Sequence, residues 1–355
     1  MKPKVLVAMS GGVDSSVAAA VLLEAGYHVE GVTMKLWGGV SDTGCCSVSD
    51  VEDARWVADQ IGVEHHVFNF GDEFEHNVVN PYIHDHLAVR TPNPCVECNR
   101  HIKFDRLMQR ADALGFNVVA TGHHARIVNT SKGWRLTRGA DDRKDQSYVL
   151  HMLKESVLQR LLFPVGDMTK TEVRNYAETR GLLTAAKPDS QGVCFITKES
   201  GRKSFLGDHI PLRPGRVVDT SGATVGAVES IEMVAVGQRR KLGIPGGSPR
   251  LYVLDVDPNT TTVLVGDQDE LNCSTTPLDD WSWVDEPVTG LLEVQTTAHG
   301  IPGLAAIDLD GTSVRWNKPH RAVAPGQSVV GYVDDIVVGG GTAGRPTTVG
   351  RYPHP

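Results

Sequence analysis

Two groups of residues in this sequence could carry out chemistry: a glycine- and serine-rich stretch near the start, and a set of cysteines. The stretch covers residues 9–16 and reads MSGGVDSS. Its glycines let the backbone approach a bulky anion, and Ser15, Ser16 and the first N–H groups of a following helix would donate hydrogen bonds to it. It lacks the lysine of a GxxxxGK(S/T) loop and contains Asp14. It therefore predicts a phosphate-binding loop of another kind, in preference to an ordinary strand–helix turn.

The cysteines favour catalysis or metal binding over a set of structural disulfides. The chain passes from MKPK directly into an apolar run, so no signal peptide is expected, and no apolar run is long enough to cross a bilayer. We therefore expect a cytoplasmic protein with no membrane partner, whose thiols stay reduced. The six cysteines are Cys45, Cys46, Cys95, Cys98, Cys194 and Cys273.

Composition sets broad limits on the function. The chain has 355 residues, enough for two or three domains. Its hydrophobic content of 40% and charged content of 22% are typical of globular proteins. The formal net charge of −8 gives no overall attraction to nucleic acid, so any such contact must come from local basic patches.

The first two hundred residues alternate between expected strands and helices. This alternation predicts a doubly wound parallel α/β sheet whose ligand lies at the carboxyl ends of the strands. A hairpin is expected over residues 125–138, and capping boxes at residues 49–52 and 169–172 should open two helices. The apolar runs that predict buried strands cover residues 4–8, 29–34, 63–70 and 118–124, the last of which runs into a loop.

Three prolines and the spacing of apolar residues set the expectations for residues 72–114. A helical pattern runs over residues 72–89, and Pro81 should mark a kink or a break. Residues 90–95 contain Pro92 and Pro94, which predicts a constrained loop that is not helical. Apolar residues recur at helical spacing over 102–114, so Cys98 is expected directly before a helix.

After about residue 205 the pattern changes to short alternating runs separated by turns. Asp310-Gly311 is a strong hairpin signal. We expect an all-β region that ends in a C-terminal barrel. The predicted domains are an α/β domain over residues 1–204, a small and mostly β linking domain over 205–274, and the barrel over 275–355.

Four separated motifs give the sequence a family resemblance. In chain order they are residues 9–16, 90–99 (RTPNPCVECN), 144–148 (KDQSY) and 189–195 (DSQGVCF). The first resembles the pyrophosphate loop of ATP pyrophosphatases. The series, in this order, resembles the bacterial tRNA-specific 2-thiouridylases, which put sulfur on C2 of the wobble uridine. The resemblance covers nearly the whole chain and implies that ATP adenylates the C2 oxygen, so that AMP can leave.

The resemblance implies the following nucleotide site. Met34 and Gly122 match adenosine-binding positions, and Asp14 is expected to help to place Mg²⁺, which would offset charge on the departing pyrophosphate. The loop expected to hold the phosphates of ATP consists of Ala8, Met9, Ser10, Gly11, Gly12, Val13, Asp14 and Ser15.

The resemblance also assigns the sulfur chemistry to two cysteines. Cys194 would carry a persulfide received from a cysteine desulfurase or a sulfur-relay protein, and Cys98 would be its partner. Either the persulfide attacks the activated uridine and Cys98 then closes a disulfide with Cys194, or Cys98 releases hydrosulfide first. A thiol reductant must then reset the pair. Without the resemblance, Cys98 could be a structural thiol. For Cys194, a small buried core residue would then be favoured over a reactive one by about two to one.

Cys95 departs from the family pattern, because many members have aspartate at this position. Three interpretations are open. Cys95 is a tolerated replacement, or it forms a redox pair with Cys98, or Cys95, Cys98 and Cys194 ligate a 4Fe–4S cluster with one iron open for sulfur.

The resemblance implies tRNA as the macromolecular partner, with the lysine, glutamate and glutamine acceptors expected. The target base should leave its stack to reach ATP. Asn93, Pro94 and Cys95 match the loop that faces this base. The positions that match tRNA contacts are His123, Lys144, Asp145, Gln146 and Gln327.

Two alternatives compete with this function. Another ATP pyrophosphatase, such as an amidotransferase synthetase or an argininosuccinate synthase, would adenylate a substrate for attack by nitrogen and would not need Cys194. A non-catalytic RNA-binding protein would keep nucleotide only as a structural ligand.

Overall fold

The computed structural model describes residues 3–36, 48–189, 192–196, 201–247 and 249–346. Cys45 and Cys46, and the glycine-rich segment around them, lie outside these ranges. The chain forms two compact units. The first comprises residues 1–80, 94–199 and 334–337, and the second comprises residues 81–93, 200–333 and 338–355.

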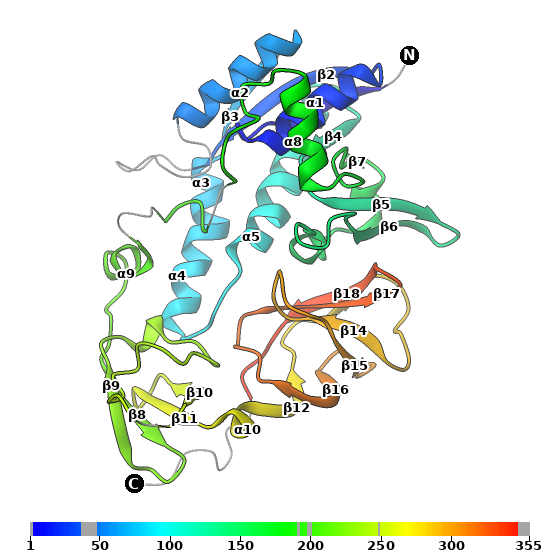
Figure 1. The fold of residues 1–355 in the computed structure, drawn as a ribbon. Helices are drawn as coiled ribbons and strands as arrows, with labels where there is room; N and C mark the ends of the chain where they lie inside the picture. Colours follow the sequence, from blue (N-terminus) through cyan, green and yellow to red (C-terminus); the bar gives the residue numbers. More distant parts are fainter. Residues whose placement is uncertain (1–2, 37–47, 190–191, 197–200, 248, 347–355) are drawn as a thin grey trace. The chain divides into compact units, whose positions relative to one another are not determined.

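The first unit is built on a five-stranded parallel sheet, which confirms the predicted α/β fold (Figure 1). The strand order is β3-β2-β1-β4-β7. The order reverses between β1 and β4, since the chain leaves β1 on one side for β2 and later returns to its other side as β4. The strands are β1 (Lys4–Ala8), β2 (His28–Lys35), β3 (His65–Asn69), β4 (Val118–Thr121) and β7 (Leu161–Leu162).

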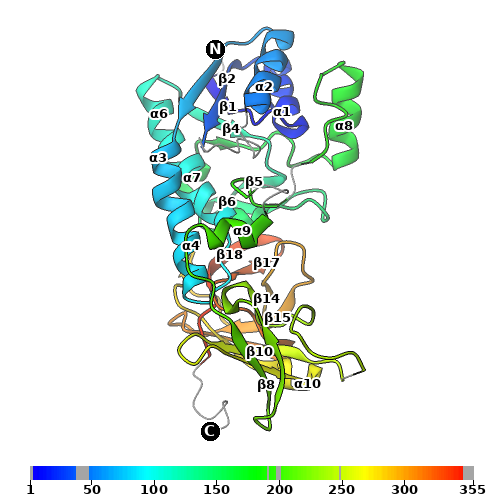
Figure 2. The same cartoon turned by 90° about the vertical axis from the view of Figure 1, so that its left-hand side faces the viewer.

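Helices cover both faces of this sheet. Figure 2 shows α1 (Val13–Glu24), α2 (Val48–Ile61) and α8 (Lys170–Thr179) on one side, and α3 (Gly71–Phe74) and α6 (Leu107–Ala113) on the other. Four of these helices are followed closely by a glycine with positive φ, because only glycine adopts this conformation without strain. These glycines are Gly26, Gly62, Gly115 and Gly181.

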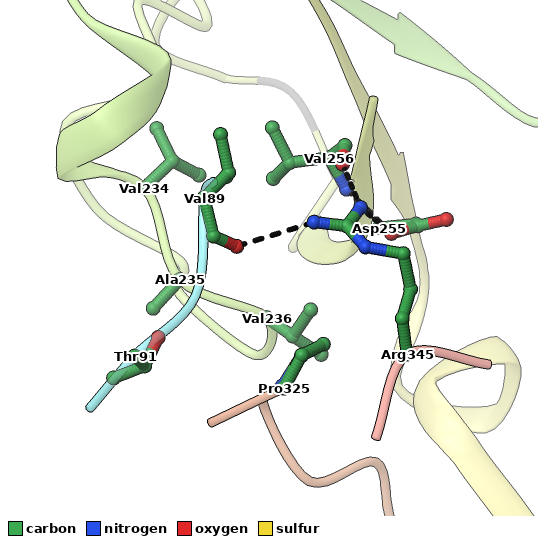
Figure 3. A pocket seen from close by; sticks show the side chains of 9 residues that line it. All are labelled: Val89, Thr91, Val234, Ala235, Val236, Asp255, Val256, Pro325 and Arg345. Carbon is green, nitrogen blue, oxygen red and sulfur yellow. Dashed lines mark hydrogen bonds and ion pairs between the residues drawn. The ribbon is translucent and has the colours of Figure 1, made fainter. Parts of the chain in front are cut away.

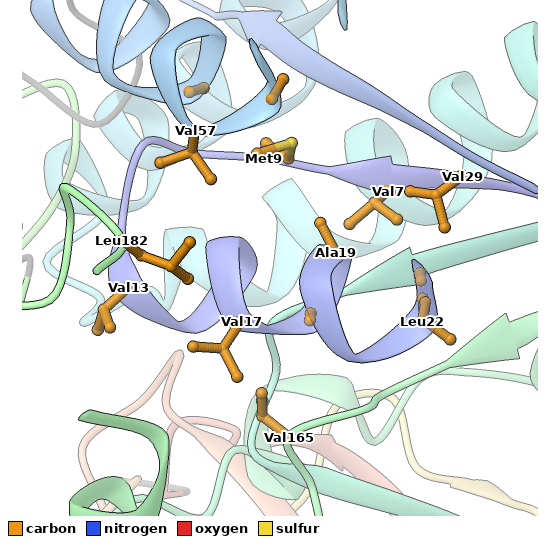
Figure 4. Close-up of a cluster of buried hydrophobic side chains, with 14 of the residues drawn as sticks. Val7, Met9, Val13, Val17, Ala19, Leu22, Val29, Val57, Val165 and Leu182 are labelled. Carbon is orange, nitrogen blue, oxygen red and sulfur yellow. The ribbon is translucent and has the colours of Figure 1, made fainter. Parts of the chain in front are cut away.

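One apolar core lies between the sheet and α1, α2 and α8 (Figure 4). Alternate residues of β1 point into it, as the two-residue period of a strand requires. Small alanines on α1 let this helix approach the sheet closely. The core includes Val5, Val7, Met9, Val13, Val17, Ala18, Ala19, Leu22, Ala54, Val57, Ala58, Val173 and Ala177.

The helical stretches around the prolines differ from the expectation in two places. The pattern over 72–89 forms α3, a π-helical segment η1 (Glu75–Val79) and α4 (Asn80–Leu87), so the irregularity comes directly before Pro81. Proline cannot donate an N–H, and a wider turn accommodates that loss. The expectation that residues 90–95 contain no helix is wrong at its end: α5 (Pro94–Glu97) begins at Pro94, where a first-turn proline loses no helical hydrogen bond.

The segment after α5 is helical without interruption. It begins with the π-helical η2 (Cys98–Arg106) and continues into α6. Cys98 therefore lies after the first helical turn, and the expectation that it directly precedes a helix is wrong. Beyond α6 and β4, the predicted hairpin is present as β5 (Ala125–Thr130) and β6 (Gly133–Arg138). The short elements η3 (Ser147–Leu150) and α7 (Glu155–Leu158) precede β7.

The second unit is mostly β, as predicted. A four-stranded sheet has the order β10-β11-β8-β9, and six further strands pair in the order β12-β16-β15-β14-β17-β18. Its short helices are α9 (Gly201–Gly207), η4 (Ile231–Met233) and α10 (Gln268–Leu271). The strands are β8 (Gly215–Asp219), β9 (Thr224–Val228), β10 (Tyr252–Asp257), β11 (Thr262–Gly266), β12 (Asn272–Pro277), β13 (Ser282–Trp283), β14 (Leu292–Gln295), β15 (Gly303–Ile307), β16 (Ser313–Arg321), β17 (Ser328–Val333) and β18 (Ile336–Thr342).

Within the described ranges, no helix combines the length and the apolar character that crossing a bilayer would require.

The core around α1 gives a first testable prediction. Leu22 is 5% exposed and packs into this core (Figure 4). Leu22→Ala should lower the free energy of unfolding by about 2–5 kcal/mol, because it removes buried apolar contacts and leaves a cavity. The measurement is the thermal midpoint of the transition that includes the parallel sheet. Leu183, which is 65% exposed, supplies the control: if Leu183→Ala lowers the midpoint equally, the core assignment is wrong.

Candidate functional site

The glycine- and serine-rich loop joins β1 to α1, as predicted. Gly11 has φ +69, a conformation that a larger side chain would strain, and a Cβ there would lie 2.4 Å from the Asp50 carbonyl oxygen. Gly12 caps α1 without a side-chain hydrogen bond. The Ser15 hydroxyl accepts from the Ser10 N–H at 3.2 Å. The loop is thus folded tightly, while the first N–H groups of α1 are left without a side-chain acceptor, which suits an anion.

The loop lies at the point where the strand order reverses, and the residues after β4 pack directly onto it. A Cβ at Gly122 would come within 2.5 Å of the Ser15 nitrogen, so glycine is required for this approach. Two residues on, His124 Nε2 donates to Asp14 Oδ1 at 3.0 Å. Ligands of open α/β sheets bind at this kind of crevice. The geometry therefore brings Asp14 to the expected ligand-binding edge.

Asp14 also contacts a lysine from a distant part of the chain. Lys170 Nζ lies 2.7 Å from Asp14 Oδ1 and 2.8 Å from Asp14 Oδ2. The same ammonium lies 2.9 Å from Asp189 Oδ1. Lys170 is the first residue of α8, whose predicted capping box between Thr169 and Glu172 is present. One ammonium group thus joins the loop after β1 to the segment that precedes Cys194.

Asp189 is held by two further cations. Lys144 Nζ contacts Asp189 Oδ2 at 2.7 Å, and Arg174 donates to Asp189 Oδ1 at 2.8 Å. Burial raises the pKa of Asp189, but hydrogen bonds from Lys144 and Lys170 outweigh it and hold the pKa well below its usual range. For Asp14, burial likewise raises the pKa, and hydrogen bonds from His124 and Lys170 bring it below its usual value. Both carboxyl groups are therefore ionised at neutral pH.

Residues 185–189, which we call the 185–189 strap, are fastened by side chains on both sides. Arg174 donates to the carbonyl oxygens of Ala185 at 2.7 Å and of Lys187 at 3.1 Å. Lys187 Nζ lies 2.7 Å from Asp50 Oδ1 in the first turn of α2, and it also pairs with Asp53. The backbone of Asp50 in turn abuts Gly11. The strap is therefore held against the same loop that holds Asp14.

The cysteines of the candidate site all lie in the first unit. Cys98 is buried, Cys95 is exposed and Cys194 is partly exposed. Phe195, next to Cys194, packs edge-on against Phe74 of α3, with ring centroids 5.8 Å apart. Because α3 also packs against η2, which begins with Cys98, the two cysteine-bearing segments share α3 as a neighbour.

Two residues predicted to contact tRNA, Asp145 and Gln146, form hydrogen bonds within the protein. Asp145 is buried and accepts from the Gly139 N–H at 2.9 Å and the Ser147 hydroxyl at 2.7 Å. Gln146 exchanges hydrogen bonds with the backbone of His124, accepting at 2.9 Å and donating at 2.8 Å. Gln146 thus fixes the residue that holds Asp14. A tRNA contact by either residue stays a prediction.

His123 and Met34 are buried at the same edge of the sheet. His123 is 7% exposed, accepts or donates at 2.6 Å with the Thr121 hydroxyl, and packs between Phe104 and Phe163. Burial lowers the pKa of His123 well below its usual value, so the ring is neutral at physiological pH. Met34 is 7% exposed at the end of β2. The roles predicted for both residues, in tRNA and in adenosine binding, stay predictions.

Gln327 lies in the second unit and contacts the segment that leads toward Asn93. Its Nε2 donates to the Thr91 carbonyl oxygen at 2.9 Å, and the Thr91 N–H donates to the Pro325 carbonyl oxygen at 2.7 Å. Beside Thr91 lies a pocket that Arg345 bridges by donating to Val89 and Val256 (Figure 3). At about 10 Å³ it holds at most one water molecule, so it is a packing feature and too small for a nucleotide.

Sequence reasoning missed two residues of this site. Lys170 was interpreted only as part of a capping box, although its sequence position, the first residue of a helix after the sheet, could have suggested a side chain near the carboxyl edge. His124 was passed over in favour of His123, yet it is His124 whose side chain reaches Asp14. The two-residue alternation of a strand breaks down at its end, so no sequence signal separated the two histidines.

Comparison with known proteins places this site in a family. Residues 3–198 match a family described as the tRNA methyl transferase HUP domain, residues 203–267 its PRC-barrel domain, and residues 275–343 an aminomethyltransferase beta-barrel domain. The chain is 44% identical over 358 residues to the tRNA-specific 2-thiouridylase MnmA of Chloroflexus aurantiacus, covering 96% of this chain and 98% of the relative. It belongs to the tRNA-specific 2-thiouridylase family.

Other members of the 2-thiouridylase family match equally well. The relative from Acidothermus cellulolyticus is 44% identical over 355 residues, covering 96% of this chain and 98% of its own. Among solved structures, a 4-thiouridine synthetase–RNA complex with bound ATP matches 54% of this chain and 45% of its own at 21% identity, with a TM-score of 0.39. This distant likeness adds nothing to the family assignment.

Gly122 provides a test of the close packing at the site. In Gly122→Ala, the added Cβ would meet backbone atoms of Asp14 and Ser15 at 2.5–2.9 Å, so the loop must shift. We expect a loss of stability of about 1–3 kcal/mol together with weaker ATP binding, measured by thermal unfolding and calorimetry. Gly246 has nothing within 4 Å of its Cβ position and ordinary φ. Gly246→Ala should therefore change neither quantity, and equal effects at both positions would contradict this packing.

His65 provides a pH test beneath the loop. Its Nε2 lies 2.9 Å from the Thr33 hydroxyl, which donates to the Met9 carbonyl oxygen at 2.8 Å. Burial, with repulsion from Arg55, lowers the pKa of His65 from 6.5 to about 4. Between these pH values the unfolded state binds more protons, so stability is present above pH 6.5 and is lost as the pH falls toward 4.

The variant His65→Gln should therefore show a shallower fall in melting temperature over this pH interval than the wild type. The exposed residue His76 gives the matched control, His76→Gln. An unchanged pH profile in His65→Gln would contradict the burial of a neutral His65.

Proposed function

We propose that this chain is an ATP-dependent sulfurtransferase that thiolates C2 of the wobble uridine of tRNA. Curated members of its family are tRNA-specific 2-thiouridylases. The observation that carries the proposal is the shared contact of Lys170: one ammonium bonds Asp14 in the loop after β1 and Asp189 in the strap before Cys194. A loop suited to phosphates and a cysteine-bearing segment thereby belong to one charged network.

The first proposed step activates the uridine. Its C2 oxygen attacks the α-phosphorus of ATP, a bond to pyrophosphate breaks, and AMP is left on the oxygen as a good leaving group. The residues proposed to hold the phosphates follow β1, from Ala8 to Ser15, where φ of Gly11 and the uncapped start of α1 fit an anion. Met34 and Gly122 are proposed for adenosine.

Mg²⁺ fits the donor set of this site. A carboxylate and phosphate oxygens are the ligands that Mg²⁺ prefers, and Asp14 is ionised and at the loop. When bound, the ion would offset the charge on pyrophosphate. The residues of the chain orient the site: His124 and Lys170 fix the two oxygens of Asp14 before any ligand arrives.

The second proposed step moves sulfur. The terminal sulfur of a Cys194 persulfide attacks C2, and the bond from C2 to the adenylated oxygen breaks, which releases AMP. Cys98 thiolate then attacks Cys194 Sγ and the persulfide S–S bond breaks, so that sulfur stays on uridine and the two cysteines form a disulfide. A thiol reductant returns two electrons to the pair. In the alternative order, Cys98 releases hydrosulfide before C2 is attacked.

The macromolecular partners follow from this chemistry. The proposed substrate is tRNA, with lysine, glutamate and glutamine acceptors, and the proposed location is the cytoplasm. A cysteine desulfurase or relay protein would load Cys194. We propose Asn93, Pro94 and Cys95 for the target base, and His123, Lys144, Asp145, Gln146 and Gln327 for other tRNA contacts. Among these residues, Lys144 would contribute a positive charge to tRNA binding. Its side chain is 38% exposed, although its ammonium also pairs with Asp189.

The test compares purified wild type with Asp14→Asn, Cys98→Ser and Cys194→Ser. Wild type supplied with tRNA, Mg²⁺, ATP and a persulfide donor should form 2-thiouridine, seen by nucleoside mass spectrometry, and release pyrophosphate. Asp14→Asn should abolish pyrophosphate release while tRNA still binds. Each cysteine variant should form no 2-thiouridine. Cys273→Ser, in the second unit, is the control and should behave as wild type.

Each competing function predicts a different result. An ATP pyrophosphatase that uses a nitrogen nucleophile would keep full product formation in Cys194→Ser. A tRNA methyltransferase, the activity in the name of the matching HUP-domain family, would give a methylated nucleoside without cleavage of ATP. A cluster on Cys95, Cys98 and Cys194 would make activity depend on iron, so fully active, iron-free enzyme would exclude it. Unimpaired 2-thiouridine in either cysteine variant would remove that residue from the mechanism.

A further inference from the structure

In the chemistry proposed above, Lys170 only helps to orient Asp14, yet its contacts extend beyond that residue. An ammonium has three N–H donors, and the oxygens within 2.9 Å of Lys170 Nζ are two of Asp14 and one of Asp189. Its side chain is only 12% exposed, so these contacts are weakly screened by solvent. Every donor of this group is used by a carboxylate, and the two carboxylates belong to segments with different tasks.

The two ends of this contact are fastened differently. Asp14 lies in the first turn of α1, next to the loop proposed for the phosphates, and is also held by His124. Asp189 lies at the end of the 185–189 strap and carries Lys144 and Arg174 as further partners. Cys194 follows Asp189 by only five positions in the sequence. If Lys170 loses or gains a hydrogen bond to one of these carboxylates, the contacts that hold both the loop and the strap change.

A bound nucleotide must change this division. Triphosphate oxygens at the start of α1 are new anionic acceptors, and a divalent cation would compete with the ammonium for Asp14. Lys170 cannot keep three short contacts to Asp14 and Asp189 while it also neutralises phosphate. Its contribution to holding Asp189 therefore depends on whether the loop is occupied.

We propose that Lys170 is a positioning residue that couples nucleotide binding at the Asp14 loop to the position of the 185–189 strap, and thereby to the reactivity of Cys194. This inference rests on the proposed function for the identity of the nucleotide and the role of Cys194. Such coupling would set the order of the two steps. The sulfur on Cys194 would reach C2 of uridine only after ATP has bound to activate the C2 oxygen. Because coupling is reciprocal, the strap also sets the affinity of the loop for ATP.

The experiment measures the alkylation rate of Cys194 by iodoacetamide, with and without Mg²⁺ and a non-hydrolysable ATP analogue. Peptide mass spectrometry follows each thiol, and the exposed Cys95 is the internal reference. In the wild type, the analogue should change the rate at Cys194 relative to Cys95 by about fivefold or more, the lower end of coupling between sites. Calorimetry gives the affinity for the analogue in parallel.

Three variants distinguish coupling from simple stabilisation. Lys170→Met should lose the response at Cys194, while Lys170→Arg, which keeps the charge and several donors, should restore most of it. Asp189→Asn leaves the contact between Lys170 and Asp14 in place, so it should bind the analogue and still lose the response. Arg180→Met, which breaks the pair with Glu24 at the other end of α8, is the control and should respond as wild type.

The outcomes separate this inference from the proposed function. If wild type makes 2-thiouridine and binds the analogue but Cys194 does not respond, the coupling is wrong and the function stands. A full response in Asp189→Asn would also overturn the coupling, and this holds even if Lys170→Met binds no nucleotide. If wild type forms no 2-thiouridine, the proposed function itself fails. A thermal scan of each variant confirms that it is folded.

Discussion

The site depends on one steric constraint, the close approach of the start of α1 to the end of β4. Gly122 permits this approach, because its missing side chain leaves room for the backbone of Asp14 and Ser15. The same approach brings His124 within reach of Asp14. Parallel strands on either side of the reversal in strand order place both segments at one edge. Without it, Asp14 would lose its contact with His124 and would be oriented by Lys170 alone.

Electrostatics then acts on this fixed geometry. Two ionised carboxylates, Asp14 and Asp189, are surrounded by Lys144, Lys170 and Arg174. Pairing of this kind adds little at an exposed surface but more where solvent is partly excluded. A site rich in paired cations before any ligand binds is prepared for phosphates, since the cations need only exchange partners. The chain as a whole is acidic, so this grouping of Lys144, Lys170 and Arg174 around Asp189 has to be built by folding.

Much of the first unit could be predicted from the sequence because its signals are local. Apolar runs predicted the strands, and the loop at residues 9–16 lies where the strand–loop–helix pattern placed it. The π-helical segments could not be predicted, since their apolar spacing differs little from that of an α-helix over so few residues. Cys98 was expected outside a helix for another reason: Pro92 and Pro94 predicted a loop, whereas α5 begins at Pro94.

The contacts between site residues far apart in the chain could not be predicted from the sequence. The pairing of Lys170 with Asp14 joins residues 156 positions apart, and no local pattern records such a contact. Lys144 and Asp189 were each inside a recognised motif, yet nothing in either motif showed that they form an ion pair. In the second unit, the alternation of short runs predicted most strands, whereas β12 and β18, which lack a clear alternation, were found only in the structure.

The link between Gln327 and Thr91 has a consequence for how this chain can change over time. Gln327 recognises a main-chain carbonyl oxygen, and Pro325 receives a main-chain N–H. Any amino acid except proline offers both groups, so substitutions of Thr91 leave this attachment in place. Gln327 has less latitude, because the attachment depends on a side-chain N–H donor of that reach.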